Sequence, residues 1–291
     1  MSCKLQKFKL LSGNEIPAIG FGTFQIRGKQ KITEVLELAL TSGYRLIDTA
    51  AVYGNEQHIG SALKTLLPKY KLKREDIFIT SKLSPSDQGP NALAALKTSI
   101  ENLQCDYLDL YLIHWPGVSG IQAESSDNFK LRNQSWASLV KGVHQGLVKD
   151  IGVSNYTVKH LKELFENSYG IKPAVNQVEW HPHYQTKELK KLCDREGIVL
   201  QAYSSLGGSN NTQLLAEPII KSVSLKLNKS PAQILLRWAL QQNIAIIPKA
   251  SNAERIKENI NLDFEIPAAD MSAILDLNKK RKYAWDPEII Y

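Results

Sequence analysis

Apolar residues along this chain follow two alternating patterns. Short apolar runs rich in β-branched residues are each followed by a segment in which apolar residues recur at helical spacing. The runs that predict strands are residues 18–23, 45–49, 77–82, 108–114, 148–154, 174–179, 199–204 and 245–249. The segments that predict helices include residues 31–41, 91–103, 136–145, 158–166, 186–196 and 231–241.

Eight strand–helix repeats in a chain of 291 residues predict a (β/α)8 TIM barrel of the α/β class, with residues 1–291 forming one domain. Short apolar stretches at 8–10 and 15–16, joined by a turn at 12–14, predict an N-terminal β-hairpin that closes the bottom of the barrel. An open doubly wound sheet is the alternative fold. It would need a third glycine after the first strand, whereas residues 20–25 read Gly-Phe-Gly-Thr-Phe-Gln.

The last predicted helix carries a complete start signal. Ser230 is a preferred N-cap residue, Pro231 suits a first helical turn, and Gln233 can complete a capping box. The pattern therefore predicts that this helix begins at Pro231.

Composition narrows the partners that we expect. The formal net charge is +7, but lysines and arginines are spread along the chain and no nucleic-acid-binding motif is present. The densest basic run, residues 279–282, is expected to be a solvated helix end. No apolar stretch is long enough to span a bilayer. We therefore expect no nucleic-acid partner and no membrane partner, and a monomer because nothing demands a second chain.

The cysteines bear on the cellular location. Cys3, Cys105 and Cys193 lie far apart and are odd in number, which argues against a disulfide framework and against a zinc site. The first residues lack the apolar core of a secretory signal. We therefore expect a cytoplasmic protein without a bound metal.

Ionisable residues gather at the ends of neighbouring predicted strands. Asp48 and Tyr53 follow the second strand, Lys82 ends the third, and His114 ends the fourth. Active sites of (β/α)8 barrels form at this edge of the barrel. A single buried Asp–Lys pair there is as often structural as catalytic, and a single Tyr or His is usually only packed. The joint occurrence of all four favours catalysis.

These four groups suit the reduction of a carbonyl, which needs hydride at carbon and a proton at oxygen. We expect Tyr53 to donate the proton, with the Lys82 ammonium stabilising the phenolate and lowering the pKa of Tyr53. Asp48 is expected to hold the ammonium and offset its desolvation. His114 is expected to hydrogen-bond the carbonyl oxygen and orient it.

The chain resembles the aldo-keto reductase superfamily over nearly its whole length. The matching motifs are Gly20-Phe21-Gly22-Thr23, Asp48-Thr49-Ala50 with Tyr53-Gly54-Asn55-Glu56, Ser81-Lys82, Leu112-Ile113-His114-Trp115-Pro116, Ile151-Gly152-Val153-Ser154-Asn155, Asn176-Gln177 and Ile247-Pro248-Lys249. Each motif is weak alone, but together, in this order, they are specific. The resemblance implies that Asp48, Tyr53, Lys82 and His114 form the catalytic tetrad. Members that reduce a steroid carbon–carbon double bond carry Glu in place of His114, so His114 favours carbonyl reduction.

The resemblance also implies a nicotinamide cofactor, NADPH or its oxidised form NADP+. Ser154, Asn155 and Gln177 could hydrogen-bond the carboxamide, and Tyr203 could stack on the nicotinamide ring. The structural alternative is that the two amides satisfy loop backbone. The full set implied to bind the cofactor is Gly22, Thr23, Phe24, Asp48, Ser154, Asn155, Gln177, Tyr203, Ser204, Leu206, Lys249, Ala250, Ser251, Arg255 and Asn259.

Two cations in the segment after the last strand favour NADPH over NADH. By resemblance, Lys249 and Arg255 would bind the 2′-phosphate at a helix start, with Asn259 near the adenine. Ala250 stands where many members have Ser, so one phosphate hydrogen bond is expected to be missing. The structural alternative for Arg255 is a solvated helix residue.

The predicted substrate pocket is apolar with a polar floor, as sites for small carbonyl compounds tend to be. Its residues are Phe24, Val52, Tyr53, His114 and Trp115. Compared with long-loop members, the loops at 117–133 and 206–212 are short, and the segment 284–291 ends early. These features predict an open site with broad specificity.

Two other functions could use the same residues. A barrel that binds NADPH could serve as a regulatory or structural protein with little catalysis, although such a protein has no reason to retain the whole tetrad. An alcohol dehydrogenase would use identical residues in the oxidising direction. The sequence favours an NADPH-dependent reductase of aldehydes and ketones.

Overall fold

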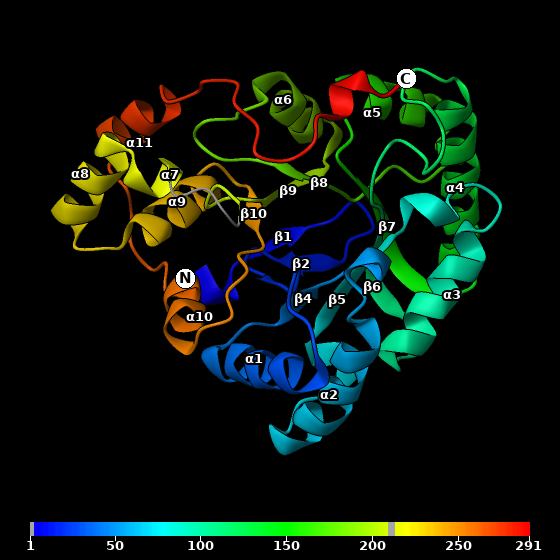
Figure 1. Ribbon diagram of the computed structural model, residues 1–291, viewed down its shortest axis with the longest axis horizontal. Helices are drawn as coiled ribbons and strands as arrows, with labels where there is room; N and C mark the ends of the chain where they lie inside the picture. The colour runs from blue at the N-terminus through cyan, green and yellow to red at the C-terminus, as the bar shows by residue number, and fades with distance from the viewer. Residues whose placement is uncertain (1–2, 209–212) are drawn as a thin grey trace.

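Within residues 3–208 and 213–291, which the computed structural model describes, eight parallel strands form one sheet that curls into a barrel (Figure 1). The strands follow each other in sequence order and are β3 (Phe21–Gly22), β4 (Leu46–Asp48), β5 (Phe78–Leu83), β6 (Leu108–Ile113), β7 (Val148–Ser154), β8 (Val175–Glu179), β9 (Val199–Tyr203) and β10 (Ala245–Ile246). The predicted (β/α)8 barrel is confirmed.

Backbone hydrogen bonds join the first and last strands and close the barrel. The amide of Gly20 donates to the carbonyl of Ile246 at 2.8 Å, and the amide of Ile246 donates to the carbonyl of Ala18 at 2.8 Å. A Cβ atom on Gly20 would overlap the side chain of Leu46, so any larger residue here would force that side chain to shift. The regular strands β3 and β10 are shorter than their apolar runs, yet these flanking residues still pair.

Helices follow the strands and form the outer layer of the molecule (Figure 1). They are α1 (Lys29–Ser42), α2 (Glu56–Lys69), α3 (Ala92–Leu103), α4 (Asp127–His144), α5 (Val158–Glu166), α6 (Lys187–Glu196), α7 (Gln213–Ala216), α8 (Pro218–Leu227), α9 (Pro231–Leu240), α10 (Ala253–Ile260) and α11 (Ala268–Leu275). In the described ranges, none of them combines the length and the apolar composition that crossing a bilayer requires. The predicted capping box at the start of α9 is confirmed, because Ser230 and Gln233 bond each other's backbone amides.

Helix α4 begins earlier than the apolar pattern predicts. It starts at Asp127 rather than at residue 136, so part of the loop expected at 117–133 is helical. Its early turns bury polar side chains, since Asn128 is 0% and Arg132 is 2% exposed, and both have hydrogen-bond or ion-pair partners. Buried polar residues carry no apolar periodicity, which is why the pattern missed this start.

The basic run 279–282 is not a solvated helix end, which corrects the prediction. Helix α11 ends at Leu275, before the run begins. Lys282 is paired with Glu179 of β8 at 2.9 Å, and its side chain is 13% exposed. Lys279 forms an ion pair with Glu217. The run therefore attaches the C-terminal segment to the barrel.

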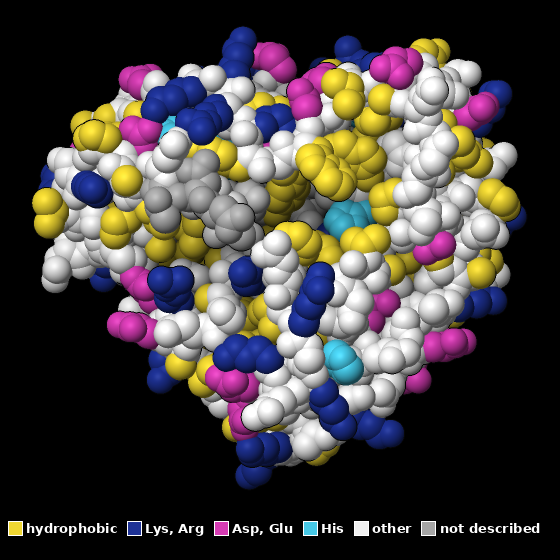
Figure 2. All heavy atoms as spheres, viewed as in Figure 1, with side chains coloured by type: hydrophobic (Ala, Val, Ile, Leu, Met, Phe, Trp, Pro, Cys, Tyr) yellow, Lys and Arg dark blue, Asp and Glu magenta, His cyan; other side chains and the backbone are white. Residues whose placement is uncertain are grey.

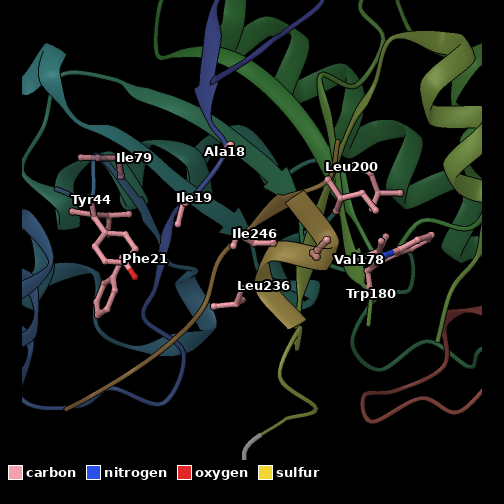
Figure 3. Packing of buried hydrophobic residues seen from close by; sticks show 14 of the residues in the cluster. Ala18, Ile19, Phe21, Tyr44, Ile79, Val178, Trp180, Leu200, Leu236 and Ile246 are labelled. Carbon is pink, nitrogen blue, oxygen red and sulfur yellow. The ribbon is translucent and has the colours of Figure 1, made fainter. Parts of the chain in front are cut away.

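The larger core lies between the outer faces of the strands and the surrounding helices. In Figure 3, Phe21 lies beside Tyr44, with ring centroids 5.5 Å apart. Trp180, just after β8, stacks on Trp238 of α9 at 6.4 Å. Both tryptophans are almost fully buried. The first contact joins β3 to the residues before β4, and the second joins the end of β8 to α9, so the core links neighbouring strand–helix repeats.

The N-terminal hairpin covers an apolar floor inside the barrel. Strand β1 (Lys7–Lys9) pairs antiparallel with β2 (Glu15–Pro17). Asn14 at the turn donates to Asp150 of β7 at 2.8 Å. The hairpin residues Leu10 and Ile16 join a buried cluster that also contains Leu46, Phe78, Leu110, Leu112, Ala174, Val175 and Ile247. The predicted hairpin is confirmed, and its apolar side chains fill one end of the barrel.

Side chains alternate between the two faces of each strand, and polar side chains follow the apolar floor on the inner face. Alternate side chains of a barrel strand point inward. Leu46 of β4 and Phe78 of β5 belong to the apolar floor. Asp48 and Lys82 occupy the same faces of these strands, nearer their carboxyl ends. The fold therefore brings two ionisable side chains into the closed interior.

The hairpin floor can be tested by truncating one of its buried side chains. Ile16→Ala should lower the free energy of unfolding by about 2–5 kcal/mol, because Ile16 is 0% exposed and its removal leaves a cavity. Urea denaturation followed by tryptophan fluorescence measures this loss. Leu11→Ala in the same hairpin is the control, because Leu11 is 49% exposed, and it should cost about 1 kcal/mol or less. Equal losses would show that the hairpin does not support the floor.

Candidate active site

A buried ion pair lies at the centre of the candidate site. The Nζ atom of Lys82 is 2.6 Å from Asp48 Oδ1, and the two side chains are 0% and 2% exposed. Lys82 also donates to the carbonyl of Thr49 at 2.8 Å and to the hydroxyl of Tyr53 at 3.3 Å. Three of the four predicted catalytic residues are therefore in direct contact.

A short 3-10 helix, Ala51–Tyr53, carries Tyr53 to this pair. Its last residue is half-buried and is followed by Gly54 in the left-handed conformation. The buried Asn55 fixes the turn, since its amide nitrogen donates to the carbonyls of Thr23 and Ile26. Asn55 had no role in the sequence analysis, although its motif was recognised.

The predicted lowering of the Tyr53 pKa is wrong for this arrangement. Burial raises the pKa of Tyr53 well above its ordinary value, and the negative charge of Asp48 raises it further. Burial also lowers the pKa of Lys82, against the opposing effects of Asp48 and Glu56. The sequence indicated that the Lys82 ammonium would lower the pKa of Tyr53, but it did not show how far burial would raise that pKa.

His114 completes the predicted group from the end of β6. Its ring lies edge-on to the ring of Tyr53, with centroids 5.7 Å apart. Burial, followed by the positive charge of Lys82, lowers the pKa of His114 to about 3. His114 is therefore neutral at physiological pH. No described residue pairs with its buried Nδ1 atom.

An amide network extends the ion pair across the barrel interior. Gln177 of β8 donates from Nε2 to Asp48 Oδ2 at 2.7 Å and to Gln201 Oε1 at 2.8 Å. Gln201 lies on β9 and is 0% exposed. It was missed in the sequence, where only its place on an inward-facing strand position could have indicated it.

Asn155, at the end of β7, links three neighbouring residues. Its amide nitrogen donates to the carbonyl of His114 at 3.0 Å and to Ser154 Oγ at 3.1 Å. Its Oδ1 atom accepts from the hydroxyl of Tyr203 at 2.7 Å. Ser154 in turn donates to the carbonyl of Gln177 at 2.8 Å. Both amide protons of Asn155 are therefore used within the protein, and only acceptor capacity is left for a ligand.

Apolar side chains lie at the surface around Tyr53 and His114, which are both half-buried. Phe24 and Val52 are 50% and 51% exposed, and the ring of Phe24 lies 5.1 Å from that of Tyr53. Trp115 contacts Trp285 edge-on at 6.3 Å. Figure 2 shows hydrophobic and histidine side chains lining a hollow in the middle of one face of the molecule. Trp285, which the sequence analysis missed, shows that the C-terminal segment reaches the predicted substrate residues.

The segment after β10 offers a surface for an anion. Lys249, Ser251 and Arg255 are exposed, and no described carboxylate pairs with the two cations. Asn252 caps α10 by accepting from the amides of Glu254 and Arg255. Unpaired cations beside a helix start fit a phosphate group.

The other residues predicted to bind the cofactor are mostly buried around this region. Asn259 and Ala250 are 3% and 6% exposed. Gly22 lies at the barrel seam, where a Cβ atom would come within 2.7 Å of the Ile247 carbonyl. Thr23 is buried and donates to the carbonyl of Asp48. Ser204 and Leu206 begin the loop after β9, of which residues 209–212 lie outside the described residues.

These donors and acceptors suit a dinucleotide that has a nicotinamide at one end and a phosphate at the other. An aromatic ring at Tyr203 and amide groups at Asn155 and Gln177 lie near the tetrad. Lys249 and Arg255, which pair with no carboxylate of the described residues, lie in the segment after β10. The residues present therefore fit the implied cofactor.

Comparison with known proteins places this arrangement in a family. The model of the aldo/keto reductase family matches residues 18–279. Glyoxal reductase from Bacillus subtilis is 43% identical over 282 residues, covering 96% of this chain and 95% of the relative. Aldose reductase B from Dictyostelium discoideum is 41% identical, covering 96% of this chain and 94% of the relative.

Solved structures agree with these relatives. An aldo/keto reductase from Brucella melitensis has a TM-score of 0.84 at 40% identity and covers 94% of this chain and 99% of its own. An aldo-keto reductase from a Medee basin deep-sea metagenome library has a TM-score of 0.87 at 37% identity, with 97% and 98% covered. The chain therefore belongs to the aldo/keto reductase family of oxidoreductases.

Proposed function

We propose that this protein is an NADPH-dependent reductase that converts small aldehydes and ketones to alcohols. The observation that carries the proposal is the contact chain Asp48–Lys82–Tyr53, in which a buried ion pair ends on a phenol next to the apolar rim. An acid at this position can protonate a carbonyl oxygen while apolar side chains exclude water. The cofactor, when bound, supplies hydride to the carbonyl carbon.

Tyr53 is proposed to transfer its hydroxyl proton to the carbonyl oxygen. Its raised pKa keeps the phenol protonated before the reaction. The Lys82 ammonium, 3.3 Å from the hydroxyl oxygen, stabilises the phenolate that remains afterwards. Asp48 holds the ammonium in place, so its desolvation is compensated.

His114 is proposed to orient the carbonyl. As a neutral imidazole it offers one N–H donor and one acceptor, and it adds no positive charge beside Lys82. A neutral donor aimed at the carbonyl oxygen lowers the energy of the charge that develops there. Its edge-on position beside Tyr53 supports a shared oxygen as the target of both groups.

The proposed cofactor preference rests on Lys249 and Arg255. Two exposed cations without a described carboxylate partner can bind the 2′-phosphate that distinguishes NADPH from NADH. The proposed substrate class rests on the apolar rim of Phe24, Val52 and Trp115. Relatives named for glyoxal reduction and aldose reduction support a small carbonyl substrate.

The proposed setting is a monomer in a reducing cytoplasm. The three cysteines are unbridged, and Cys3 and Cys193 are buried. Residues 1–291 are proposed to act as one domain, because strands near both ends of the chain form the same barrel seam.

Removing the hydroxyl of Tyr53 tests the proposed acid. Tyr53→Phe should reduce kcat for aldehyde reduction by about 10²–10⁴-fold, because the proton donor is lost while the ring remains. NADPH consumption measured by absorbance gives kcat. As the control, the Kd for NADPH from fluorescence titration should stay within about twofold of wild type. Full turnover by the variant would overturn the assignment. Tight NADPH binding without wild-type turnover would favour a regulatory or structural role.

Removing one cation tests the proposed cofactor preference. Arg255→Ala should raise the Kd for NADPH by about tenfold or more, because a charge-assisted hydrogen bond to phosphate is lost. The Kd for NADH should change by about twofold or less. Lys257→Ala on the same helix is the control, since Lys257 is also exposed and has no proposed contact with phosphate. An equal loss for both cofactors would show that Arg255 does not bind the 2′-phosphate.

The pH dependence of reduction tests the proposed protonation states. The pKa of His114 is lowered from 6.5 to about 3, and that of Tyr53 is raised, so neither group titrates as the pH falls from 8 to 5.5 or so. The kcat for reduction should therefore show no step near pH 6.5. Stopped-flow rates of hydride transfer at each pH provide the measurement. A step with a midpoint near 6.5 would mean that His114 titrates normally and that its neutral state is wrongly assigned.

A further inference from the structure

The buried amide of Gln201 has no part in the proposed proton transfer. Gln201 is 0% exposed and lies between Val199 and Tyr203 on β9, two residues from each, so all three face the barrel interior. Its Nε2 group is fully buried and pairs with no described residue. A buried donor without a partner costs stability, and an apolar side chain of similar size would avoid that cost. The unpaired nitrogen therefore does not account for a glutamine here, and any role of this side chain must lie with its oxygen.

The other end of this amide helps to fix Gln177. Gln201 Oε1 accepts from Gln177 Nε2 at 2.8 Å, while Asp48 Oδ2 accepts from the same nitrogen at 2.7 Å. An amide nitrogen has two protons, so both are used. A flipped Gln177 would place its oxygen against two acceptor oxygens. Two neighbouring side chains thus impose one orientation on the Gln177 amide.

In this orientation the carbonyl oxygen of Gln177 is still available to accept a hydrogen bond. No described residue donates a hydrogen bond to its Oε1 atom. Because the nitrogen faces Asp48 and Gln201, the oxygen lies at the other edge of the planar amide. A carbonyl oxygen held in this way can accept a hydrogen bond from the amino group of a carboxamide.

We propose that Gln201 is a positioning residue, which fixes the amide of Gln177 so that its oxygen is presented to the carboxamide of the nicotinamide. This inference rests on the proposed function. Without Gln201, one proton of Gln177 loses its acceptor and only Asp48 restrains the amide. The nicotinamide end of the cofactor would then be held less firmly, while the phosphate end would bind as before.

Two substitutions of Gln201 separate the effect of its hydrogen-bond acceptor from the effect of its side-chain volume. Gln201→Leu removes the acceptor, whereas Gln201→Glu, which burial beside Asp48 keeps protonated, retains a carbonyl oxygen that can accept from Gln177. Gln233→Leu is the matched control, because Gln233 is a buried glutamine of α9 whose loss breaks a helix cap away from the tetrad. Calorimetric titration with NADP+ and with adenosine 2′,5′-bisphosphate, which lacks the nicotinamide, reports binding at the two ends of the cofactor.

The expected result is a selective loss. Gln201→Leu should raise the Kd for NADP+ by about three- to tenfold and slow hydride transfer by about tenfold. The Kd for adenosine 2′,5′-bisphosphate should stay within about twofold of wild type. Gln201→Glu should bind NADP+ within about threefold of wild type. Gln233→Leu should lower the melting temperature and leave both ligands and the hydride-transfer rate unchanged.

Other outcomes would overturn the proposal. If Gln201→Leu bound NADP+ and transferred hydride as the wild type does, Gln201 would not position Gln177. An equal loss of affinity for both ligands would indicate a general structural role. Gln201→Met, with a side chain of matching length, repeats the test if Gln201→Leu does not fold. A wild-type protein that reduces no carbonyl would overturn the proposed function. An active wild type with an unaffected Gln201→Leu would overturn the role of Gln201 alone.

Discussion

The ion pair of Lys82 and Asp48 is the constraint on which the upper half of the barrel depends. Two charges removed from water destabilise the fold unless other groups satisfy them. Here the Thr49 carbonyl and the Gln177 amide do so, from the end of β4 and from β8. The pair therefore fixes the height and the register at which these strands present their side chains. An apolar floor below it prevents water from reaching it from the hairpin end.

The same burial that sustains the pair also governs its proton chemistry. Tyr53 experiences an ammonium that favours its phenolate, and burial and a carboxylate that favour its phenol. In the structure, burial and the carboxylate outweigh the ammonium, so the pKa of Tyr53 is raised. The phenol of Tyr53 is therefore protonated, which is the state that the proposed reduction requires. His114 is kept neutral by burial as well, and here the second cause is the positive charge of Lys82.

Much of this arrangement could be predicted because it depends on patterns along the chain. Alternating strands and helices indicated the barrel, and Asp48, Lys82 and His114 at the strand ends indicated a shared rim. Features that depend on contacts between distant strands were missed. Gln201 is linked to the site by its contact with Gln177, and Trp285 by its contact with Trp115. The pKa of Tyr53 depends on how deeply the ring is buried, which no spacing of residues reveals.

Barrel closure also constrains the order in which the molecule can assemble. Gly20 pairs with Ile246, and Gln177 reaches Asp48 from 129 positions along the chain. A polypeptide still emerging from the ribosome lacks these late segments, so β3 presents an open sheet edge and Asp48 lacks its amide partner. Open edges invite pairing with other chains. Synthesis of the last quarter of the chain, which contains Ile246, is therefore the step that ends the exposure of the β3 edge, whereas Gln177 is made well before it.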